Sequence, residues 1–460
     1  CPSDGPPGRR PARPPPPATA PPPPRPPPAP APRLPYGLLS RNPMQTAPSS
    51  PPPSLLALTP PMGWMSWGRF RCAEHVGGGL DCAAHPESCI GEWLYHGTAD
   101  ALVRGGFTAA GYRTLHVDDC WEAMHRDSAG ELRPNASRFP SGFGGPRGLV
   151  SYVRARGLTL GLYSDAGSAT CGGFPGSWGH EARDASMFEA WGVSYLKQDG
   201  CHVSPKDLAQ GYVAMGAALR ALRSTMVYSC SWPAYLGDDE ANKPFDAMAA
   251  AGCNLWRNWH DVQCSWASVS SIIEHWGRYS AVLQSAAGPG RWNDPDMLLV
   301  GALDGRYGPC LTAAQERTQL AIWAIIAAPL IMGNDVRNIS QSSRALLLNR
   351  RAIAVSQDTM GRPGGRLSAS QGARVQIWAR HLSNGDVAVG LYHRGTVFPP
   401  PIPPPPCEAW EHAWDGFWES GYGQNLSTFS KLNRSQAQAI CCAAPKCAGF
   451  SFHQMPVTPS

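Results

Sequence analysis

The chain has 460 residues, enough for one large domain of about 300 residues with smaller appendages. Its formal net charge of +5 comes from charges of both signs spread along the sequence, which gives no argument for a nucleic-acid or membrane-surface partner. The longest apolar run, Leu320 to Met332, is shorter than the roughly 20 residues that a membrane span requires, and Pro329 interrupts it. The composition therefore indicates a soluble protein without a membrane span.

Residues 1–53 are dominated by Pro, Ala and Arg, a composition that predicts disorder, with a proline-rich ligand for a partner domain as the alternative. From 54 to 355, strand-like segments alternate with helical ones at about the 30-residue period of a βαβ unit. Eight strands are predicted, at Met62–Trp64, Thr114–Val117, Thr159–Tyr163, Ser194–Lys197, Met226–Ser229, Leu255–Asn258, Ala281–Ser285 and Pro329–Met332. The pattern predicts an α/β fold, a (β/α)8 TIM barrel. A doubly wound sheet is the alternative, although no Gly-x-Gly-x-x-Gly follows the first strand.

Three further segments follow the predicted barrel. Residues 356–397 predict a partial antiparallel β-domain, in which Arg374 to Arg394 alternates as two strands around the turn at 383–386. Residues 398–406 form a Pro-rich linker. Residues 407–460 form a small Cys-rich module that is similar to apple or PAN-type modules, and a truncated copy is one interpretation of it.

Cysteine usage indicates the compartment. Fifteen cysteines are many for a cytosolic enzyme, and they lack the repeated spacings of a zinc site, so disulfides are the favoured interpretation. Acceptor sequons at Asn135, Asn338, Asn425 and Asn433 are compatible with a secreted, lysosomal or vacuolar protein. No signal peptide is visible at Cys1, from which we expect an incomplete N-terminus.

Polar and aromatic side chains gather at the predicted carboxyl ends of the strands, which meet at one mouth of a barrel. They are Trp64, Asp118 with Asp119, Tyr163 with Asp165, Lys197 with Asp199, Ser231 with Trp232, Arg257 with Asp261, and Asp294 with Asp296. Carboxylates and cations suit sugar hydroxyls, an aromatic ring suits the apolar face of a sugar, and two carboxylates suffice for nucleophile and acid. Taken singly, each residue is also explained as an ordinary strand-end polar group. The chemical rival is a divalent-metal site from Asp118, Asp119, Asp294 and Asp296, which the neighbouring Lys and Arg disfavour.

Eight motifs between Leu58 and about Leu391 resemble those of the α-galactosidases and α-N-acetylgalactosaminidases of glycoside hydrolase family 27. They are Thr59-Pro60-Pro61-Met62-Gly63-Trp64, Asp118-Asp119-Cys120-Trp121, Gly161-Leu162-Tyr163-Ser164-Asp165, Leu196-Lys197-Gln198-Asp199-Gly200-Cys201, Tyr228-Ser229-Cys230-Ser231-Trp232-Pro233, Trp256-Arg257-Asn258, the run from Ala287 to Met297, and Ala328-Pro329-Leu330. The resemblance implies a retaining exo-glycosidase that needs no metal or organic cofactor, with Asp199 as nucleophile and Asp261 as general acid/base.

The resemblance also implies which residues bind the sugar and which cysteines pair. The implied sugar-binding residues are Trp64, Asp118, Asp119, Tyr163, Lys197, Ser231, Ala234, Tyr235, Arg257 and Asp296. The implied disulfides are Cys72 with Cys120, Cys82 with Cys89, Cys171 with Cys201, and Cys230 with Cys253. Cys264 and Cys310 are left over, either free or paired with each other.

The loop after the fifth strand bears on the choice of sugar. Galactose-specific members of the family have a bulky Glu and Leu there, whereas members that accept N-acetylgalactosamine have Ser and Ala. The small pair Ser231 and Ala234 predicts room for an acetamido group. The implied partners are α-galactoside-containing oligosaccharides, glycolipids or glycoproteins, and a homodimer is left open. The alternatives are a plain α-galactosidase and a catalytically weak carbohydrate-binding or adhesion protein.

Three features depart from the family pattern. A Gly-rich insertion at 73–79 lies between the first two cysteines of the matched region. His260 precedes Asp261 where small or aromatic residues are more usual, and a space-filling role is the favoured interpretation. The family's C-terminal β-domain is represented only by its first hairpin, so the Cys-rich module is an insertion or replacement, or else the chain is truncated.

Overall fold

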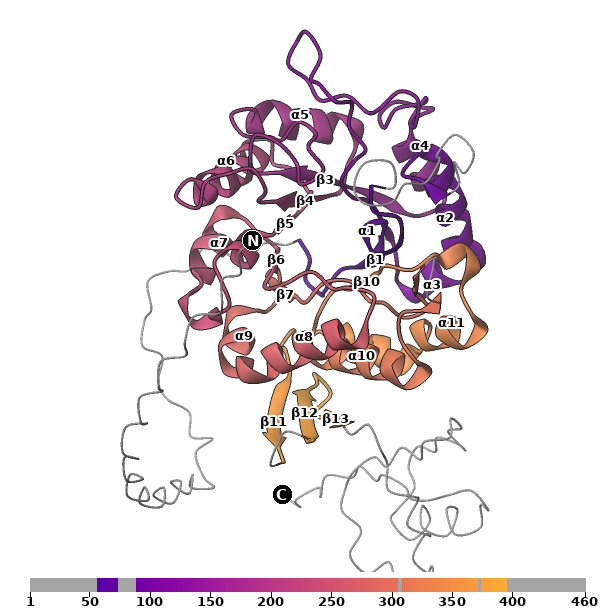
Figure 1. The fold of residues 1–460 in the computed structure, drawn as a ribbon, viewed down its shortest axis with the longest axis vertical. Coiled ribbons are helices and arrows are strands. Elements are labelled where there is room, and N and C mark those ends of the chain that lie inside the picture. The colour runs from indigo at the N-terminus through magenta and orange to yellow at the C-terminus, as the bar shows by residue number, and fades with distance from the viewer. Residues whose placement is uncertain (1–55, 73–87, 305–307, 371–373, 395–460) are drawn as a thin grey trace, which may run out of the picture. The chain divides into compact units, whose positions relative to one another are not determined.

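The computed structural model describes residues 56–72, 88–304, 308–370 and 374–394. Eight parallel strands form one sheet in the order β10-β1-β2-β3-β4-β5-β6-β7. Their bounds are β1 Met62–Met65, β2 Thr114–Val117, β3 Thr159–Asp165, β4 Tyr195–Asp199, β5 Val227–Cys230, β6 Leu255–Arg257, β7 Trp292–Asp294 and β10 Leu330–Met332. Leu298, just beyond β7, pairs in parallel with Met332 of β10 and so joins the two ends of the sheet. The predicted (β/α)8 barrel is confirmed (Figure 1).

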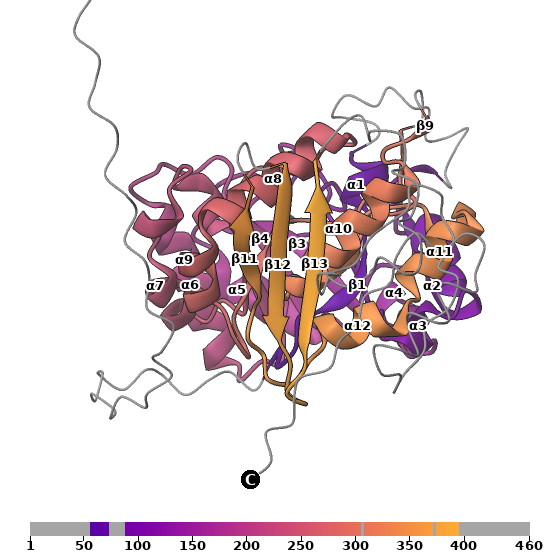
Figure 2. The ribbon, with the colours of Figure 1, turned by 90° about the horizontal axis from the view of Figure 1, so that it is seen from below.

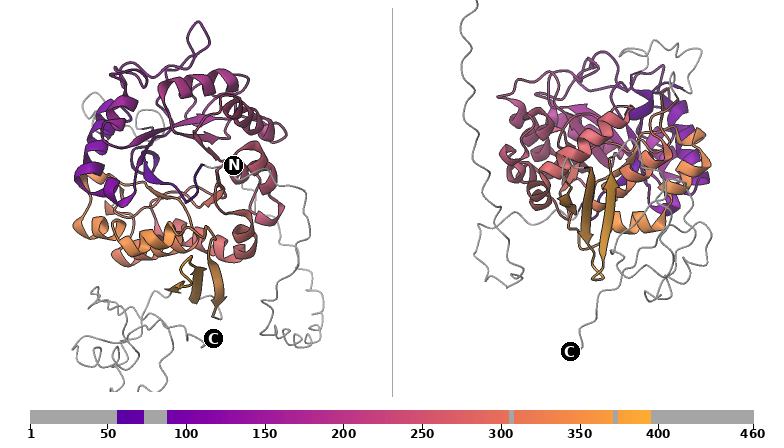
Figure 3. Two further views of the ribbon diagram at one scale, coloured as in Figure 1. Left: turned by 180° about the vertical axis from the view of Figure 1, so that it is seen from behind. Right: turned by 60° about the horizontal axis from the view of Figure 1, so that its bottom comes forward.

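Helices surround the strands (Figures 1 and 3). They are α1 Trp67–Phe70, α2 Glu92–Arg104, α3 Phe107–Ala110, α4 Leu149–Arg154, α5 Glu181–Trp191, α6 Leu208–Ala221, α7 Phe245–Ala251, α8 Trp266–Arg278, α9 Ser280–Ala286, α10 Ala313–Ile325, α11 Gln341–Leu347 and α12 Arg350–Ser356. Local sequence fixes several ends: Thr312 and Gln315 form a capping box at the start of α10, and Ser265 caps α8. Within the described ranges, no helix is both long and apolar enough to cross a membrane.

Strand register determines which side chains meet at the mouth of the barrel. Tyr163 of β3 lies beside Lys197 of β4, and Asp165 lies beside Asp199 one pleat further on. Because side chains alternate along a strand, residues two apart share a face and residues in register lie next to each other. Four functional side chains are therefore brought together by the last residues of only two strands.

The seventh predicted strand is wrong. Ala281–Ser285 lies within helix α9, and the seventh strand is β7, Trp292–Asp294. A short apolar run cannot be assigned to strand or helix by periodicity alone, and this run continues the helical segment that follows α8. The strand itself was missed because it has three residues and two of them, Asn293 and Asp294, are polar. A small two-stranded ribbon, β8 Leu303–Asp304 with β9 Gly308–Pro309, was not predicted either.

A separate antiparallel sheet follows the barrel, with β11 Gly365–Ala369, β12 Val375–His381 and β13 Val387–His393 in that order. It contains the hairpin predicted around 383–386, together with β11, whose sequence lacks apolar alternation. Figures 2 and 3 show these strands beside the barrel's helices. Buried Arg380 of β12 donates hydrogen bonds to Ala324 O (2.9 Å) and Val355 O (2.6 Å), which ties the sheet to α10 and α12.

The predicted segments at 1–53, 398–406 and 407–460 lie outside the described residues, and the predicted domain boundaries stay predictions.

Disulfides connect parts of the barrel that lie between 23 and 48 residues apart in the sequence. The structure pairs Cys72 with Cys120, Cys171 with Cys201, and Cys230 with Cys253, as the resemblance implies, with Cα separations of 5.6, 5.2 and 5.9 Å. It also pairs Cys264 with Cys310 (Cα separation 4.7 Å), which resolves the two alternatives left open for them. Cys89 is disulfide-bonded, and its expected partner Cys82 lies outside the described residues.

Candidate active site

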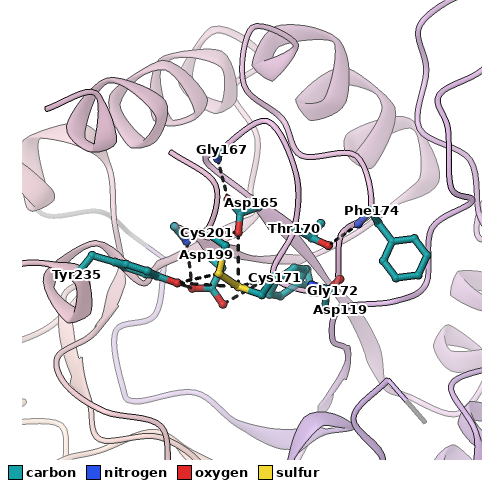
Figure 4. Close-up of a disulfide and its surroundings, with 12 residues drawn as sticks. Asp119, Asp165, Gly167, Thr170, Cys171, Gly172, Phe174, Asp199, Cys201 and Tyr235 are labelled. Carbon is teal, nitrogen blue, oxygen red and sulfur yellow. Dashed lines mark hydrogen bonds between the residues drawn. A yellow bond between two sulfur atoms is a disulfide. The ribbon is translucent and has the colours of Figure 1, made fainter. Parts of the chain in front are cut away.

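Asp199, the last residue of β4, is held by three hydrogen-bond donors. Its Oδ1 accepts from the Tyr235 hydroxyl at 2.7 Å (Figure 4). The same oxygen accepts from the Gly200 backbone N–H (3.0 Å), and Oδ2 accepts from the Tyr163 hydroxyl (3.2 Å). A Cβ on Gly200 would lie 2.8 Å from the Tyr235 ring, so only glycine lets that ring approach. The carboxylate is therefore oriented by two phenols and the backbone, which suits a nucleophile.

Lys197 and Asp118 form a buried ion pair beside Asp199, with Nζ and Oδ2 2.8 Å apart. Burial raises the pKa of Asp118 and outweighs its pairing with the ammonium group. Burial disfavours the charge on Lys197, but the carboxylates of Asp118 and Asp199 together raise the pKa of the lysine above its ordinary value. Lys197 is therefore a permanent cation beside the candidate nucleophile.

Asp119 faces the loop that follows β3. Its Oδ2 accepts from the Gly172 N–H and its Oδ1 from the Cys120 N–H, both at 2.7 Å. Burial raises the pKa of Asp119 to about 6. Cys120 has a φ of 76°, a left-handed conformation that costs a non-glycine residue energy and that the disulfide to Cys72 helps to hold.

A second group of charges surrounds Arg257, at the end of β6. Its guanidinium lies 2.9 Å from Asp261 Oδ1 and 3.3 Å from Asp296 Oδ2, and the Asp296 carboxylate also accepts from the Val262 N–H (2.8 Å). The Arg257 charge lowers the pKa of Asp261, whose side chain is 62% exposed. Asp296 has a φ of 80°, and such local strain is common at functional sites.

The aspartates of the rival metal site are separated into two groups by these contacts. Asp118 pairs with Lys197, and Asp296 pairs with Arg257. Burial raises the pKa of Asp294, the last residue of β7, to about 6. Cations of the protein already occupy the positions next to two of the four carboxylates, so the arrangement favours binding of polar hydroxyls over binding of a metal ion.

The turn after β5 brings three predicted residues to the same place. Ser231 precedes the 3-10 helix η2, Trp232–Tyr235, and the Ala234 N–H bonds back to Ser231 O (3.1 Å). Trp232 stacks on Tyr212 of α6, with ring centroids 5.5 Å apart and planes within 3°, which anchors the turn. The Tyr235 hydroxyl at the end of this turn contacts Asp199, so Ser231 and Ala234 belong to a turn that reaches the candidate nucleophile.

Trp64, at the predicted carboxyl end of the first strand, is enclosed by other side chains. Its side chain has no exposed surface, since it packs against Phe70 and Tyr95 with both ring centroids 6.0 Å away and donates its indole N–H to Asn334 O (2.7 Å). The ring is therefore part of the hydrophobic core, and the predicted contact of Trp64 with a sugar stays a prediction.

Two other positions show where sequence reasoning was incomplete. The sequence places Asp165 at a predicted strand end but indicates no catalytic or sugar-binding role for it. In the structure, Asp165 is in register with Asp199 and so lies at the site. Burial, followed by the charge on Asp199, raises the pKa of Asp165 to about 8. His260, next to Asp261, is 66% exposed and lies 3.2 Å from Asp238, so it is a rim residue and fills no interior space. The insertion at 73–79 lies outside the described residues.

A (β/α)8 barrel whose mouth combines a cation-flanked carboxylate with a second, arginine-bound carboxyl group has the architecture and the chemistry of a glycoside hydrolase. Comparison with known families agrees: the family model described as Alpha galactosidase A matches residues 59–358. The chain belongs to this family, glycoside hydrolase family 27.

Relatives within the family carry two different names. The α-N-acetylgalactosaminidase of Gallus gallus is 43% identical over 345 residues, which cover 75% of this chain and 81% of the relative. The α-galactosidase A of Homo sapiens is 43% identical over 343 residues, 74% of this chain and 76% of the relative. The crystal structure of α-galactosidase I from Mortierella vinacea is similar with a TM-score of 0.62 and 31% identity, covering 74% of this chain and 83% of that one. The chain is therefore a glycosidase of the α-galactosidase and α-N-acetylgalactosaminidase type.

Proposed function

We propose that this enzyme is a retaining exo-glycosidase that removes terminal α-D-galactosyl-type residues, including α-N-acetylgalactosamine, from oligosaccharides, glycolipids or glycoproteins. Asp199 is the nucleophile and Asp261 is the general acid/base. The observation that carries the proposal is the Asp199 carboxylate, which Tyr235, Tyr163 and Gly200 hold at the carboxyl end of β4. Its neighbour Lys197, which pairs with Asp118, places a positive charge beside this carboxylate.

The reaction has two steps. In the first, an Asp199 oxygen attacks the anomeric carbon, the glycosidic C–O bond breaks, and Asp261 gives its proton to the departing oxygen. In the second, the Asp261 carboxylate takes a proton from water, the water oxygen attacks the anomeric carbon, and the ester bond to Asp199 breaks. Two inversions leave the sugar with its α configuration, which requires carboxyl groups about 5 to 5.5 Å apart.

Asp261 must be protonated for the first step and ionised for the second. Because the Arg257 charge lowers the pKa of Asp261, the carboxylate needed for the second step is already favoured. The protonated fraction needed for the first step grows as pH falls, so kcat/KM should be higher at acidic than at neutral pH. An acidic, disulfide-permitting compartment, such as a lysosome, vacuole or the secretory route, suits both this behaviour and the disulfides.

Specificity follows from the turn beside the nucleophile. Ser231 and Ala234 have short side chains, and the Tyr235 phenol of the same turn contacts Asp199, so the pair lies close to the reacting sugar. A Glu and a Leu at these positions would fill the volume that an acetamido group needs, and a Ser hydroxyl offers that group a hydrogen-bond partner.

The test compares kcat/KM for nitrophenyl α-N-acetylgalactosaminide and nitrophenyl α-galactoside. We expect the wild-type enzyme to hydrolyse the acetamido substrate at least as well as the galactoside. Ser231→Glu combined with Ala234→Leu should reverse that preference by about 10-fold or more. The matched control, Ser271→Glu with Ala267→Leu on the exposed surface of α8, should leave the ratio unchanged. If the wild-type enzyme did not hydrolyse the acetamido substrate, the proposed specificity would be refuted. If it hydrolysed neither substrate, the hydrolase assignment would fail and the carbohydrate-binding alternative would be favoured.

A further inference from the structure

Asp165 is the last residue of β3 and lies in register with Asp199, the last residue of β4. Its side chain is fully buried, and it has no part in the steps proposed above. Its two carboxyl oxygens nevertheless accept hydrogen bonds from two different loops, one after β3 and one after β4 (Figure 4).

The Asp165 carboxyl group connects those two loops. Its Oδ1 accepts from the Gly167 N–H (2.7 Å) in the loop after β3, and its Oδ2 accepts from the Cys201 N–H (3.0 Å) in the loop after β4. A side chain at Gly167 would collide with the Cys201 carbonyl oxygen, so the two loops are in direct contact. The disulfide between Cys171 and Cys201 closes the same pair of loops covalently, and Cys171 Sγ lies 3.9 Å from the Asp165 Oδ2.

The far side of this disulfide contacts the group that orients the nucleophile. Cys201 Sγ lies 3.4 Å from the Tyr235 hydroxyl, which donates to Asp199 Oδ1 at 2.7 Å. Cys171 Sγ lies 3.3 Å from the Tyr163 hydroxyl, which donates to the other oxygen of Asp199. Both phenols that hold the nucleophile therefore contact the sulfur atoms of one disulfide, and the Asp165 carboxyl group accepts from the backbone N–H of Cys201, one of its two cysteines.

We propose that Asp165 is a positioning residue for the nucleophile: by fixing the Cys201 backbone and the adjoining disulfide, it sets where the Tyr235 and Tyr163 hydroxyls hold the Asp199 carboxylate. This inference rests on the proposed function, in which Asp199 attacks the sugar. A misplacement of reacting atoms by about 1 Å costs on the order of 10²-fold in rate, so a residue that never touches substrate can control the chemical step in this way.

The experiment measures the nucleophile directly. An activated fluorosugar of galactose configuration forms a slowly hydrolysed ester with the nucleophile, so the inactivation rate at saturation reports attack and the half-saturation concentration reports binding. In Asp165→Asn, the amide oxygen can serve only one of the Gly167 and Cys201 N–H groups. We expect the saturated inactivation rate and kcat to fall about 10²-fold, while half-saturation and KM change by less than about 3-fold.

Asp184→Asn is the matched control. Asp184 is as fully buried as Asp165, but the groups that its carboxylate binds are Arg126 (2.7 Å) and the Ser177 hydroxyl (2.8 Å), neither of which holds Asp199. The Asp184→Asn substitution should lower the urea concentration at the unfolding midpoint and leave the saturated inactivation rate unchanged. If Asp165→Asn did the same, Asp165 would be a structural residue and the proposal would be wrong.

A double-mutant cycle with Tyr235→Phe tests the path. The Tyr235 side chain is 40% exposed, so this variant keeps the core intact even if Asp165→Asn does not fold. Tyr235→Phe alone should slow inactivation at least 10-fold, and adding Asp165→Asn should slow it by much less than the product of the two single effects. If Tyr235→Phe were inactivated at the wild-type rate, or if the effects of the two substitutions on the inactivation rate were fully additive, Asp165 would not act on Asp199 through Tyr235.

The label in the wild-type enzyme separates this inference from the proposed function. Peptide mass spectrometry should find the fluorosugar on Asp199. A label on another residue would refute the proposed nucleophile, whereas a label on Asp199 that forms equally fast in Asp165→Asn would refute only the positioning role.

Discussion

Replacing Glu122 with methionine should stabilise this enzyme, and should do so more strongly at neutral than at acidic pH. The Glu122 side chain is fully buried, and neither of its carboxyl oxygens has a hydrogen-bond partner among the described residues. Burial, followed by the negative charge of Asp119, raises the pKa of Glu122 well above its usual range. Burial and the Asp119 charge therefore outweigh the opposing charge of Arg138 and favour the neutral acid in the folded enzyme.

The sign of the pH dependence follows from the direction of that shift. In the unfolded chain Glu122 ionises near its ordinary pKa of 4.5, whereas the folded chain holds the proton to higher pH. The stability associated with the protonated form is complete below 4.5 and is lost as pH rises toward the folded pKa. That stability is lost progressively between the pKa of the unfolded chain and the higher pKa of the folded chain, whereas methionine does not titrate. Removing two unpaired buried acceptors adds about 1–3 kcal/mol at any pH.

The assay is urea unfolding followed by tryptophan fluorescence at pH 4.5 and pH 6.5. Glu122→Met should raise the unfolding free energy at both values, with the larger gain at pH 6.5. Glu131→Met removes an exposed glutamate and serves as the control, and we expect no gain in unfolding free energy from it because that side chain is not buried. An equal gain for Glu122→Met at the two pH values, or a loss at pH 6.5, would refute the reasoning from burial and charge.

Three further predictions concern the site and its supports. Asp199→Asn and Asp261→Asn should each lower kcat by about 10³-fold or more with an unchanged circular dichroism spectrum, because each removes a group used in bond breaking; near-wild-type turnover would contradict the assigned roles. Arg380→Met should lower the unfolding free energy by about 3 kcal/mol or more, because four hydrogen bonds to carbonyl oxygens are lost, and should leave KM unchanged; an unchanged urea midpoint would show that the β11–β13 sheet is held otherwise. Deleting Cys407 to Ser460 should leave kcat and KM unchanged, since every assigned group precedes Pro329; a folded but inactive product would assign the tail a part in the site.

The sequence was most informative where local pattern and topology agree. Thr114–Val117 and Thr159–Asp165 are apolar segments of strand length with polar residues at their carboxyl ends, and such ends meet at one mouth in any parallel barrel. The site residues could therefore be grouped before any contact was known. The seventh strand could not be predicted from the sequence, because Trp292–Asp294 is too short to show a periodic pattern. Its place in the barrel depends on pairing with Leu255–Arg257.

Contacts between side chains were beyond the reach of the sequence. Nothing in the spacing shows that Tyr235 reaches Asp199, because that contact depends on the turn of η2 and on the absence of a side chain at Gly200. The enclosure of Trp64 likewise depends on Tyr95, a residue of α2 outside every recognised motif. Register explains the importance of Asp165, and register is known only once β3 and β4 are paired.

The central claim is that Asp199 attacks the sugar and that the configuration at the anomeric carbon is kept. Proton NMR of the first product, recorded before mutarotation, tests it most directly, with nitrophenyl α-galactoside as substrate. The two-step mechanism predicts that the α-anomer of the free sugar appears first and the β-anomer accumulates later by mutarotation. Initial appearance of the β-anomer would mean direct attack by water, and it would contradict the role assigned to Asp199.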